Sequence, residues 1–151
     1  MADIFFTQEH DLLRQSIRSF VEKEITPHAD EWEEASYFPD SVFRRMGELG
    51  FLGLHFPEEY GGGGGDYFTN IVLVEELGRC GTDGVNTGIA VQIGMATPPI
   101  LAFGTEEQKQ RYLVPALSGE KIACLGSPSL MPARTSPTSA PSRRRSRAAG
   151  G

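Results

Sequence analysis

Apolar residues recur every three or four positions along much of this chain, a spacing that places them on one face of an α-helix. Thr7 is a residue type that caps helix N-termini, and Pro27 is one that ends helices. Between them lie the regularly spaced apolar residues Leu13, Ile17, Phe20, Val21 and Ile25. The pattern predicts an amphipathic helix that begins after Thr7 and ends at Pro27.

Further helices are predicted downstream. A short acidic helix covers about residues 29–35, and Pro39-Asp40 opens another that Gly50 ends in a left-handed cap. The segment from Tyr67 is apolar on most sides, which is typical of a helix at the centre of a bundle.

The helical pattern continues in the C-terminal half. Residues 85–103 contain small residues that let another helix or a ligand come close, and Pro98 and Pro99 must kink this helix or divide it in two. Thr105 and Gln108 then form a capping box for a helix that ends before Pro115.

After Gly119 the pattern changes. The run IACL, residues 122–125, is too short for a helix and is typical of a strand in a sheet. A strand needs a partner, and the residues downstream supply none. We therefore expect an orphaned strand at residues 121–126.

Residues 127–151 differ in composition from everything before them. They hold no acidic or aromatic residue and almost no aliphatic one, so they cannot offset the entropy of ordering, and we expect a disordered tail. The tail carries five of the 14 basic residues, which leaves residues 1–126 with 9 basic and 20 acidic residues. That charge argues against nucleic-acid binding by the body of the chain.

Other patterns for chemistry are weak. The five glycines at residues 61–65 suggest a phosphate-binding loop, but no GK[ST] follows and no strand precedes them, so we favour a plain turn. His10, His28 and His55 lack metal-ligand spacing, and no metal site is expected.

The cellular setting is inferred from the cysteines and from hydropathy. Cys80 and Cys124 lie far apart without a CxxC spacing, and the N-terminus lacks a signal-peptide pattern, so we expect a reduced, cytoplasmic protein. No apolar run approaches the roughly 18 residues that cross a bilayer, so no membrane span is expected.

Three segments together carry a family resemblance: FTQEHDLLRQSIRSFVEKEITPHADEWE, GFLGLHFPEEYGGGGGD and ILAFGTEEQKQRYLVPALSGEKIACLG. They resemble the N-terminal helical domain of the acyl-CoA dehydrogenases, in unbroken order over residues 4–126. The pairing of PEEYGG with FGTEEQKxxYLxPxLxxGE is specific to that superfamily, although it does not separate dehydrogenases from their acyl-CoA oxidase and flavin monooxygenase relatives.

The resemblance implies an all-α fold, the helical-bundle N-terminal domain of the acyl-CoA dehydrogenase fold. Residues 1–120 would form this domain, residues 121–126 would begin the middle β-domain, and residues 127–151 would be the disordered tail.

The resemblance also implies the chemistry of the intact enzyme, which is FAD-dependent α,β-desaturation of acyl-CoA thioesters in fatty-acid or related catabolism, with electrons passed to an electron-transfer flavoprotein. The family's catalytic base is a glutamate of the C-terminal helical domain, which this chain lacks, so we expect no catalytic residue here. Six glutamates of this chain are candidate replacements, and all six are expected to be solvated helix or loop charges instead: Glu22, Glu24, Glu58, Glu59, Glu75 and Glu76.

Five residues match binding positions of the family. Leu125 and Gly126 match the edge of the FAD site. Asn86, Thr87 and Ala90 match positions that line the acyl tunnel, and helix packing is an equally favoured interpretation of these three. Because most of the FAD pocket belongs to domains that this chain lacks, we expect the fragment to retain no FAD and to be inactive alone.

Two other functions remain open. The chain could be a non-catalytic interaction module that associates with a full-length acyl-CoA dehydrogenase or with homologous subunits, through exposed apolar residues at Ile71, Leu73, Val74 and Ile89. A nucleic-acid binder that works through the Arg-rich end is a third, disfavoured hypothesis.

The tail itself suggests a shifted reading frame. In the family, the segment after a strand of this kind reads ITEPxAGSD, whereas Gly126 here is followed by SPSLMPARTSPTSAP. Synonymous codons can be chosen for these residues so that adding one base in front shifts the reading frame. The shifted frame then translates to ITEPDAGSDVADIRT. The single codon of Met131 supplies the G that the shifted Ala codon requires, and the other residues leave few choices per position.

We therefore predict a one-base deletion near codon 127, in the gene or in its sequencing. The nucleotide sequence around this codon should spell ITEPDAGSD in the neighbouring frame and continue with the rest of the enzyme. A sequence that supports the written tail, with no such frame beneath it, would contradict the prediction.

Overall fold

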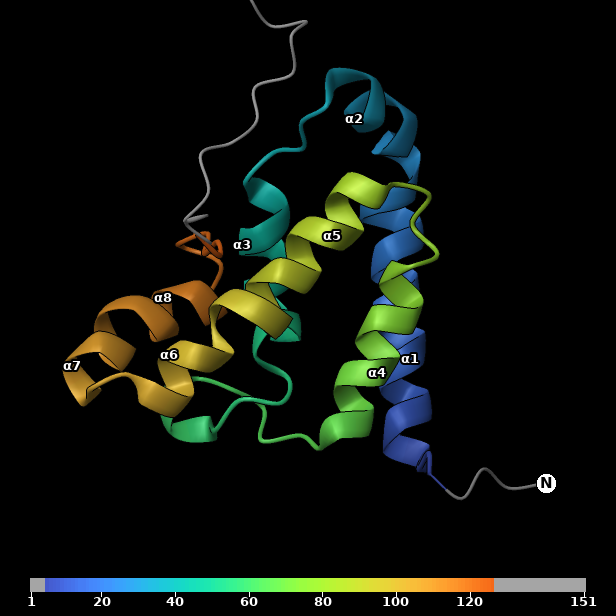
Figure 1. The fold of residues 1–151 in the computed structure, drawn as a ribbon. Helices are drawn as coiled ribbons and strands as arrows, with labels where there is room; N and C mark the ends of the chain where they lie inside the picture. The colour runs from blue at the N-terminus through green and yellow to red at the C-terminus, as the bar shows by residue number, and fades with distance from the viewer. Residues whose placement is uncertain (1–4, 127–151) are drawn as a thin grey trace, which may run out of the picture.

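The computed structural model describes residues 5–126, and this part of the chain is helical and contains no β-strand (Figure 1). The prediction of an all-α fold is confirmed. Its α-helices are α1 (Gln8–Phe20), α2 (Ala29–Ala35), α3 (Ser41–Glu48), α4 (Tyr67–Leu77), α5 (Asp83–Val91), α6 (Pro98–Phe103), α7 (Glu106–Gln108) and α8 (Val114–Leu117).

Helix α1 begins at the predicted cap. The Thr7 hydroxyl accepts from the His10 amide, and the His10 ring accepts from the Thr7 amide through Nδ1 at 3.1 Å. The other ring nitrogen of His10 lies 3.0 Å from Asp66 Oδ1, and Asp66 is the N-cap of α4. His10 therefore joins the starts of two helices, which is a packing role of the kind expected for it.

Pro27 does not end the helical path, which corrects the sequence prediction. The chain continues from α1 through a π-helical turn, Val21–Ile25, and a 3-10 turn, Thr26–His28, directly into α2. Proline is tolerated here because it lies in the first turn of a new helical segment, where its missing N–H has no partner to lose. Pro115 is accommodated in the same way near the start of α8, so the helix predicted to end before it continues past it.

Helices α1 and α4 lie side by side along one edge of the molecule (Figure 1), and a buried carboxylate joins them. Glu76 is 1 % exposed. Arg18 donates to both its oxygens at 2.8 Å, and Arg14 donates to Oε1 at 3.1 Å. The carboxylate is buried and fully paired, so its expected role as a solvated charge is wrong.

The core packs around this pair. It includes Ile17 from α1, Met46 from α3, Leu73 from α4 and Ile89 from α5, all at most 1 % exposed. Leu73 and Ile89 are therefore unavailable as the exposed docking residues that the interaction-module hypothesis assigned to them. Val74, by contrast, is 42 % exposed.

The predicted division of residues 85–103 is confirmed. Helix α5 passes into a π-helical turn, Gln92–Ala96, and α6 begins at Pro98. A second, smaller apolar cluster under α6 and α8 contains Phe56, Tyr60, Leu113 and Leu117. The capping box of Thr105 and Gln108 is present at the start of α7, as predicted.

The Glu76 pairing generates a stability prediction. Glu76→Gln should lower the free energy of unfolding by about 1.5–3 kcal/mol, because a neutral carboxamide at this buried position cannot accept the charged hydrogen bonds from Arg18 and Arg14 through both of its terminal atoms. Glu75→Gln is the matched control: its side chain is 51 % exposed and pairs only with Arg14, so its cost should stay below about 1 kcal/mol. Urea unfolding at neutral pH measures both, and equal effects would contradict the assigned role.

The pH dependence has a defined sign. Hydrogen bonds from Arg18, and then from Arg14, lower the pKa of Glu76 in the folded state. The contribution of the ionised Glu76 side chain to the free energy of unfolding is therefore fully present above the ordinary Glu pKa of about 4.3. It is lost as the pH falls through the lower pKa that Glu76 has in the folded state. The stability difference between wild type and Glu76→Gln should shrink over that acidic range.

Candidate functional site

Helix α5 carries the three predicted acyl-lining residues on its outer side. Thr87 is exposed, whereas Asn86 and Ala90 are half-buried. The opposite side of α5 carries Val85 and Ile89, which are fully buried in the core. The structure thus gathers the predicted residues on one open helix face, and their role as acyl-lining residues stays a prediction.

A groove of about 650 Å³ runs along the adjacent side of α5. Its floor includes Gly84, Gly88 and Val91, and the extended segment 122–124 forms one wall. The Asn86, Thr87 and Ala90 side chains do not line it. A Cβ at Gly88 would lie 2.9 Å from Phe38 Cζ, so the small residue here serves close packing against the aromatic wall.

The N-terminus of α5 is held by a carboxylate from α2. Glu33 Oε1 accepts from the Thr82 hydroxyl and from the Gly84 amide, the latter at 3.0 Å. The Gly84 hydrogen bond, followed by that of Thr82, lowers the pKa of Glu33. A carboxylate stabilised in its charged form as a helix cap is a poor proton acceptor, so Glu33 does not serve as a base.

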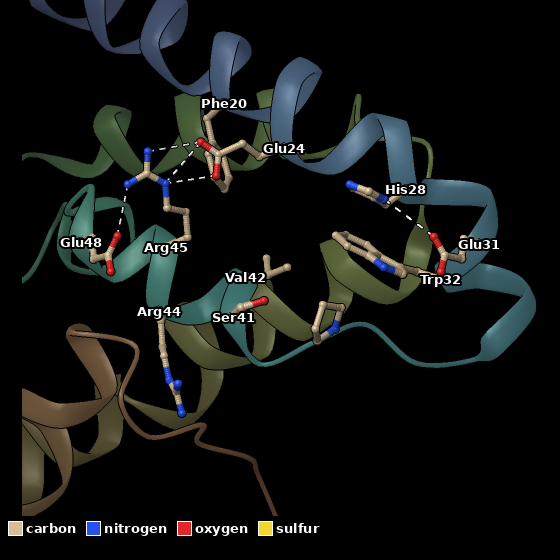
Figure 2. Close-up of a pocket in the computed structure, with 11 residues that line it drawn as sticks. Phe20, Glu24, His28, Glu31, Trp32, Ser41, Val42, Arg44, Arg45 and Glu48 are labelled. Atoms are coloured by element: carbon tan, nitrogen blue, oxygen red, sulfur yellow. Dashed lines mark hydrogen bonds and ion pairs between the residues drawn. The ribbon is translucent and has the colours of Figure 1, made fainter.

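A second groove, of about 670 Å³, lies between the end of α1, α2 and α3. Figure 2 shows two sets of paired charged groups in it: Arg45 bonds Glu24 and Glu48, and His28 lies 3.7 Å from Glu31. The His28 ring stacks on Trp32 with 5.2 Å between centroids, which gives both residues packing roles. The three glutamates and the histidine that line this groove each have an ion-pair partner among the described residues.

The glycine run is a folded loop whose amides are already used. The amides of Gly62, Gly63, Gly64 and Gly65 donate to backbone carbonyl oxygens of residues 53–57 at 2.8–3.1 Å. No amide of this stretch remains to bind a phosphate oxygen, so the turn, which we favoured over a phosphate-binding loop, is confirmed.

A polar residue that the sequence pattern did not single out fixes the end of the described chain. Gln92 is fully buried at the C-terminal end of α5, and its amide bonds the backbone of α8 and of the segment after it. Its signal in the sequence is a polar side chain at a position where the helical spacing of Val85 and Ile89 predicts an apolar one.

Comparisons with known proteins agree with this architecture. The family model for the acyl-CoA dehydrogenase N-terminal domain matches residues 7–120. The chain belongs to the acyl-CoA dehydrogenase family. It is 44 % identical over 121 residues to a probable acyl-CoA dehydrogenase of Bacillus subtilis, which covers 80 % of this chain and 31 % of that protein.

Two further relatives show the same extent of similarity. The short-chain-specific acyl-CoA dehydrogenase of Clostridium acetobutylicum is 44 % identical over 125 residues, 82 % of this chain and 32 % of that protein. A crystal structure of an acyl-CoA dehydrogenase from Bacillus anthracis complexed with FAD has a TM-score of 0.74 at 32 % identity, over 82 % of this chain and 21 % of that one. The chain thus spans about a third of the length of its curated relatives.

Leu125 and Gly126, predicted at the edge of an FAD site, lie at the end of the described residues, and their role in binding FAD stays a prediction. Leu125 is 59 % exposed, and no atom lies within 4 Å of a Cβ built on Gly126. Within residues 5–126, neither residue makes a hydrogen bond that could orient a flavin. The predicted strand that carries them is absent as well: residues 122–126 have no regular secondary structure, because no second strand lies beside them in the part described.

The described part of the chain contains no group of three or more His, Cys, Asp or Glu residues that could hold a metal ion. No helix among residues 5–126 is long and apolar enough to span a membrane.

The glycine loop generates a prediction. Gly62→Ala should destabilise the fold by about 1–3 kcal/mol, because its Cβ would lie 2.1 Å from the Phe56 carbonyl oxygen. Gly94→Ala is the control: nothing lies within 4 Å of its Cβ, and alanine should be neutral or stabilise by about 0.5–1 kcal/mol. Thermal unfolding followed by circular dichroism tests both, and a neutral Gly62→Ala would contradict the close packing of the loop.

Proposed function

We propose that this chain is the helical N-terminal part of an FAD-dependent acyl-CoA dehydrogenase that desaturates acyl-CoA thioesters, and that it does not catalyse the reaction alone. The open outer face of α5 carries this proposal. This face carries Asn86, Thr87 and Ala90, the residues that match acyl-lining positions of the family.

The absence of a base matters for this reaction. A general base must lie within hydrogen-bond reach of the proton that it removes. The buried glutamate, Glu76, is bound by arginines, and Glu33 caps α5, so both are held in their charged forms for structural reasons. In the proposed enzyme the base and most of the flavin pocket come from parts beyond this helical domain.

We propose the corresponding division of the chain. Residues 1–120 are the N-terminal domain, residues 121–126 begin the middle domain, and residues 127–151 are the product of a shifted reading frame. The intact enzyme would bind FAD and acyl-CoA and pass electrons to an electron-transfer flavoprotein. Two free cysteines, Cys80 and Cys124, support a reduced, cytoplasmic setting.

A second candidate function is association with a full-length acyl-CoA dehydrogenase. Apolar exposure favours it: Phe103 is 88 % exposed, Met95 51 % and Tyr112 45 %, although Leu73 and Ile89 lie in the core. Exposed apolar side chains of this size are typical of surfaces that another protein covers.

One purification separates these functions. The tagged chain is isolated from cells that contain full-length acyl-CoA dehydrogenases, and a second sample is incubated with FAD and butyryl-CoA. The first proposal predicts a colourless single polypeptide with no flavin absorbance and no bleaching by butyryl-CoA. A yellow complex whose partner is identified as a full-length relative would support the second function. A yellow chain that is bleached by butyryl-CoA on its own would contradict both.

A further inference from the structure

Gln92 makes three hydrogen bonds through one buried carboxamide. Its Nε2 donates to the carbonyl oxygens of Ala116 at 2.9 Å and Lys121 at 3.0 Å, and its Oε1 accepts from the Ala123 amide at 2.6 Å. The Gln92 side chain is fully buried, and the bond to Ala116 is buried with it, whereas the bonds to Lys121 and Ala123 are partly buried. One side chain of α5 is thereby bonded to α8 and to both ends of the tripeptide 121–123.

The backbone around Gln92 fixes the direction of this side chain. Gln92 begins the π-helical turn after α5, and its own carbonyl oxygen accepts from the Thr97 hydroxyl at 2.6 Å and from the Thr97 amide at 3.3 Å. Thr97 is fully buried as well. Because these bonds restrain the Gln92 backbone, the side chain loses little further conformational entropy when it forms its own hydrogen bonds.

Segment 122–126 has no other anchor of this kind. It has no strand partner in the described part of the chain, and the Ala123 amide bond to Gln92 is the hydrogen bond that ties it to a helix. Lys121, one residue earlier, is tied to α8 by its amide, which donates to the Pro115 carbonyl oxygen at 2.9 Å. Without Gln92, the chain after Lys121 would be free to swing away from α5.

We propose that Gln92 is a positioning residue for the acyl site. It locks the segment that leaves the helical domain against the helix that carries Asn86, Thr87 and Ala90. The placement of residues 124–126 relative to the outer face of α5 then depends on this carboxamide. The inference rests on the proposed function for its connection with acyl binding, whereas the lock itself is a property of the chain alone.

The two native cysteines allow a direct test on the full chain. Cys124 is exposed and adjoins the locked amide, whereas Cys80 is 1 % exposed and its thiol donates to the Thr82 carbonyl oxygen at 3.3 Å. Burial also raises the pKa of Cys80, which lowers its reactivity further. A nitroxide reagent should therefore label Cys124 selectively, and its electron paramagnetic resonance spectrum then reports the mobility of the segment.

The test variant is Gln92→Met, which keeps the volume of the side chain and removes its hydrogen bonds. We expect the nitroxide at Cys124 to change from restricted to fast motion, and the Ala123 amide to exchange at least about tenfold faster, as the loss of one protecting hydrogen bond implies. Ile89→Val is the matched control, because Ile89 is a buried residue of the same helix and the change lowers stability without touching the lock.

A second variant keeps the test independent of packing. In Gln92→Glu, burial should raise the pKa of the new carboxyl group, so that at about pH 5 it is neutral and can still accept from Ala123 and donate to one carbonyl oxygen. At about pH 9 it is charged and faces two carbonyl oxygens without a donor. The label should be restricted at the lower pH and mobile at the higher pH in this variant, while wild type stays restricted at both.

The nitroxide spectra of these variants decide whether Gln92 holds segment 122–126 against α5. The proposal is supported if the nitroxide at Cys124 becomes mobile in Gln92→Met, and at high pH in Gln92→Glu, but stays restricted in Ile89→Val. An unchanged nitroxide spectrum in Gln92→Met, or equal loosening in Ile89→Val, overturns it. Detection of bound flavin in the colour test would overturn the proposed function without altering these spectra, so the two failures are distinguishable.

Discussion

The pairing of α1 with α4 is the constraint on which the rest of this helical domain depends. Glu76 is buried between the two helices, where the guanidinium groups of Arg18 and Arg14, with Arg79 at 3.7 Å, compensate its charge. Because these groups fix how the helices face each other, Ile17 and Leu73 meet in the core and α5 can pack across them. His10 adds a second link by joining the caps of the same two helices.

This packing gives a domain with a core of its own but an incomplete site. The polar groups of the described grooves mostly serve the fold: Glu33 caps α5, Arg45 bonds Glu24 and Glu48, and the glycine amides bond their own loop. The outer face of α5, with Thr87 exposed and Asn86 and Ala90 half-buried, is not used in this way. In the function that we propose, such a domain would supply one wall of a site whose reacting groups come from other parts of the enzyme.

Local signals in the sequence predicted local structure well. The capping boxes at Thr7 and Thr105 are formed by residues three positions apart, so their pattern is readable without the fold. Pro27 and Pro115 were misread, because a proline in the first turn of a new helical segment looks the same in sequence as one that ends a helix. Glu76 and Gln92 were also missed, since the partners that make a buried polar group acceptable come from distant segments. The acyl-lining residues came from family resemblance rather than from any pattern.

We expect the helical domain to fold independently of the further domains of the proposed enzyme. Urea unfolding of the chain tests this most directly. The unfolding is monitored in parallel by the fluorescence of Trp32, the single tryptophan of the chain, and by the circular dichroism signal of the helices. The account predicts one cooperative transition with coincident midpoints for the two signals, because Trp32 packs against the same core as the helices. A gradual loss of helix, or a tryptophan signal that changes without a transition, would contradict it.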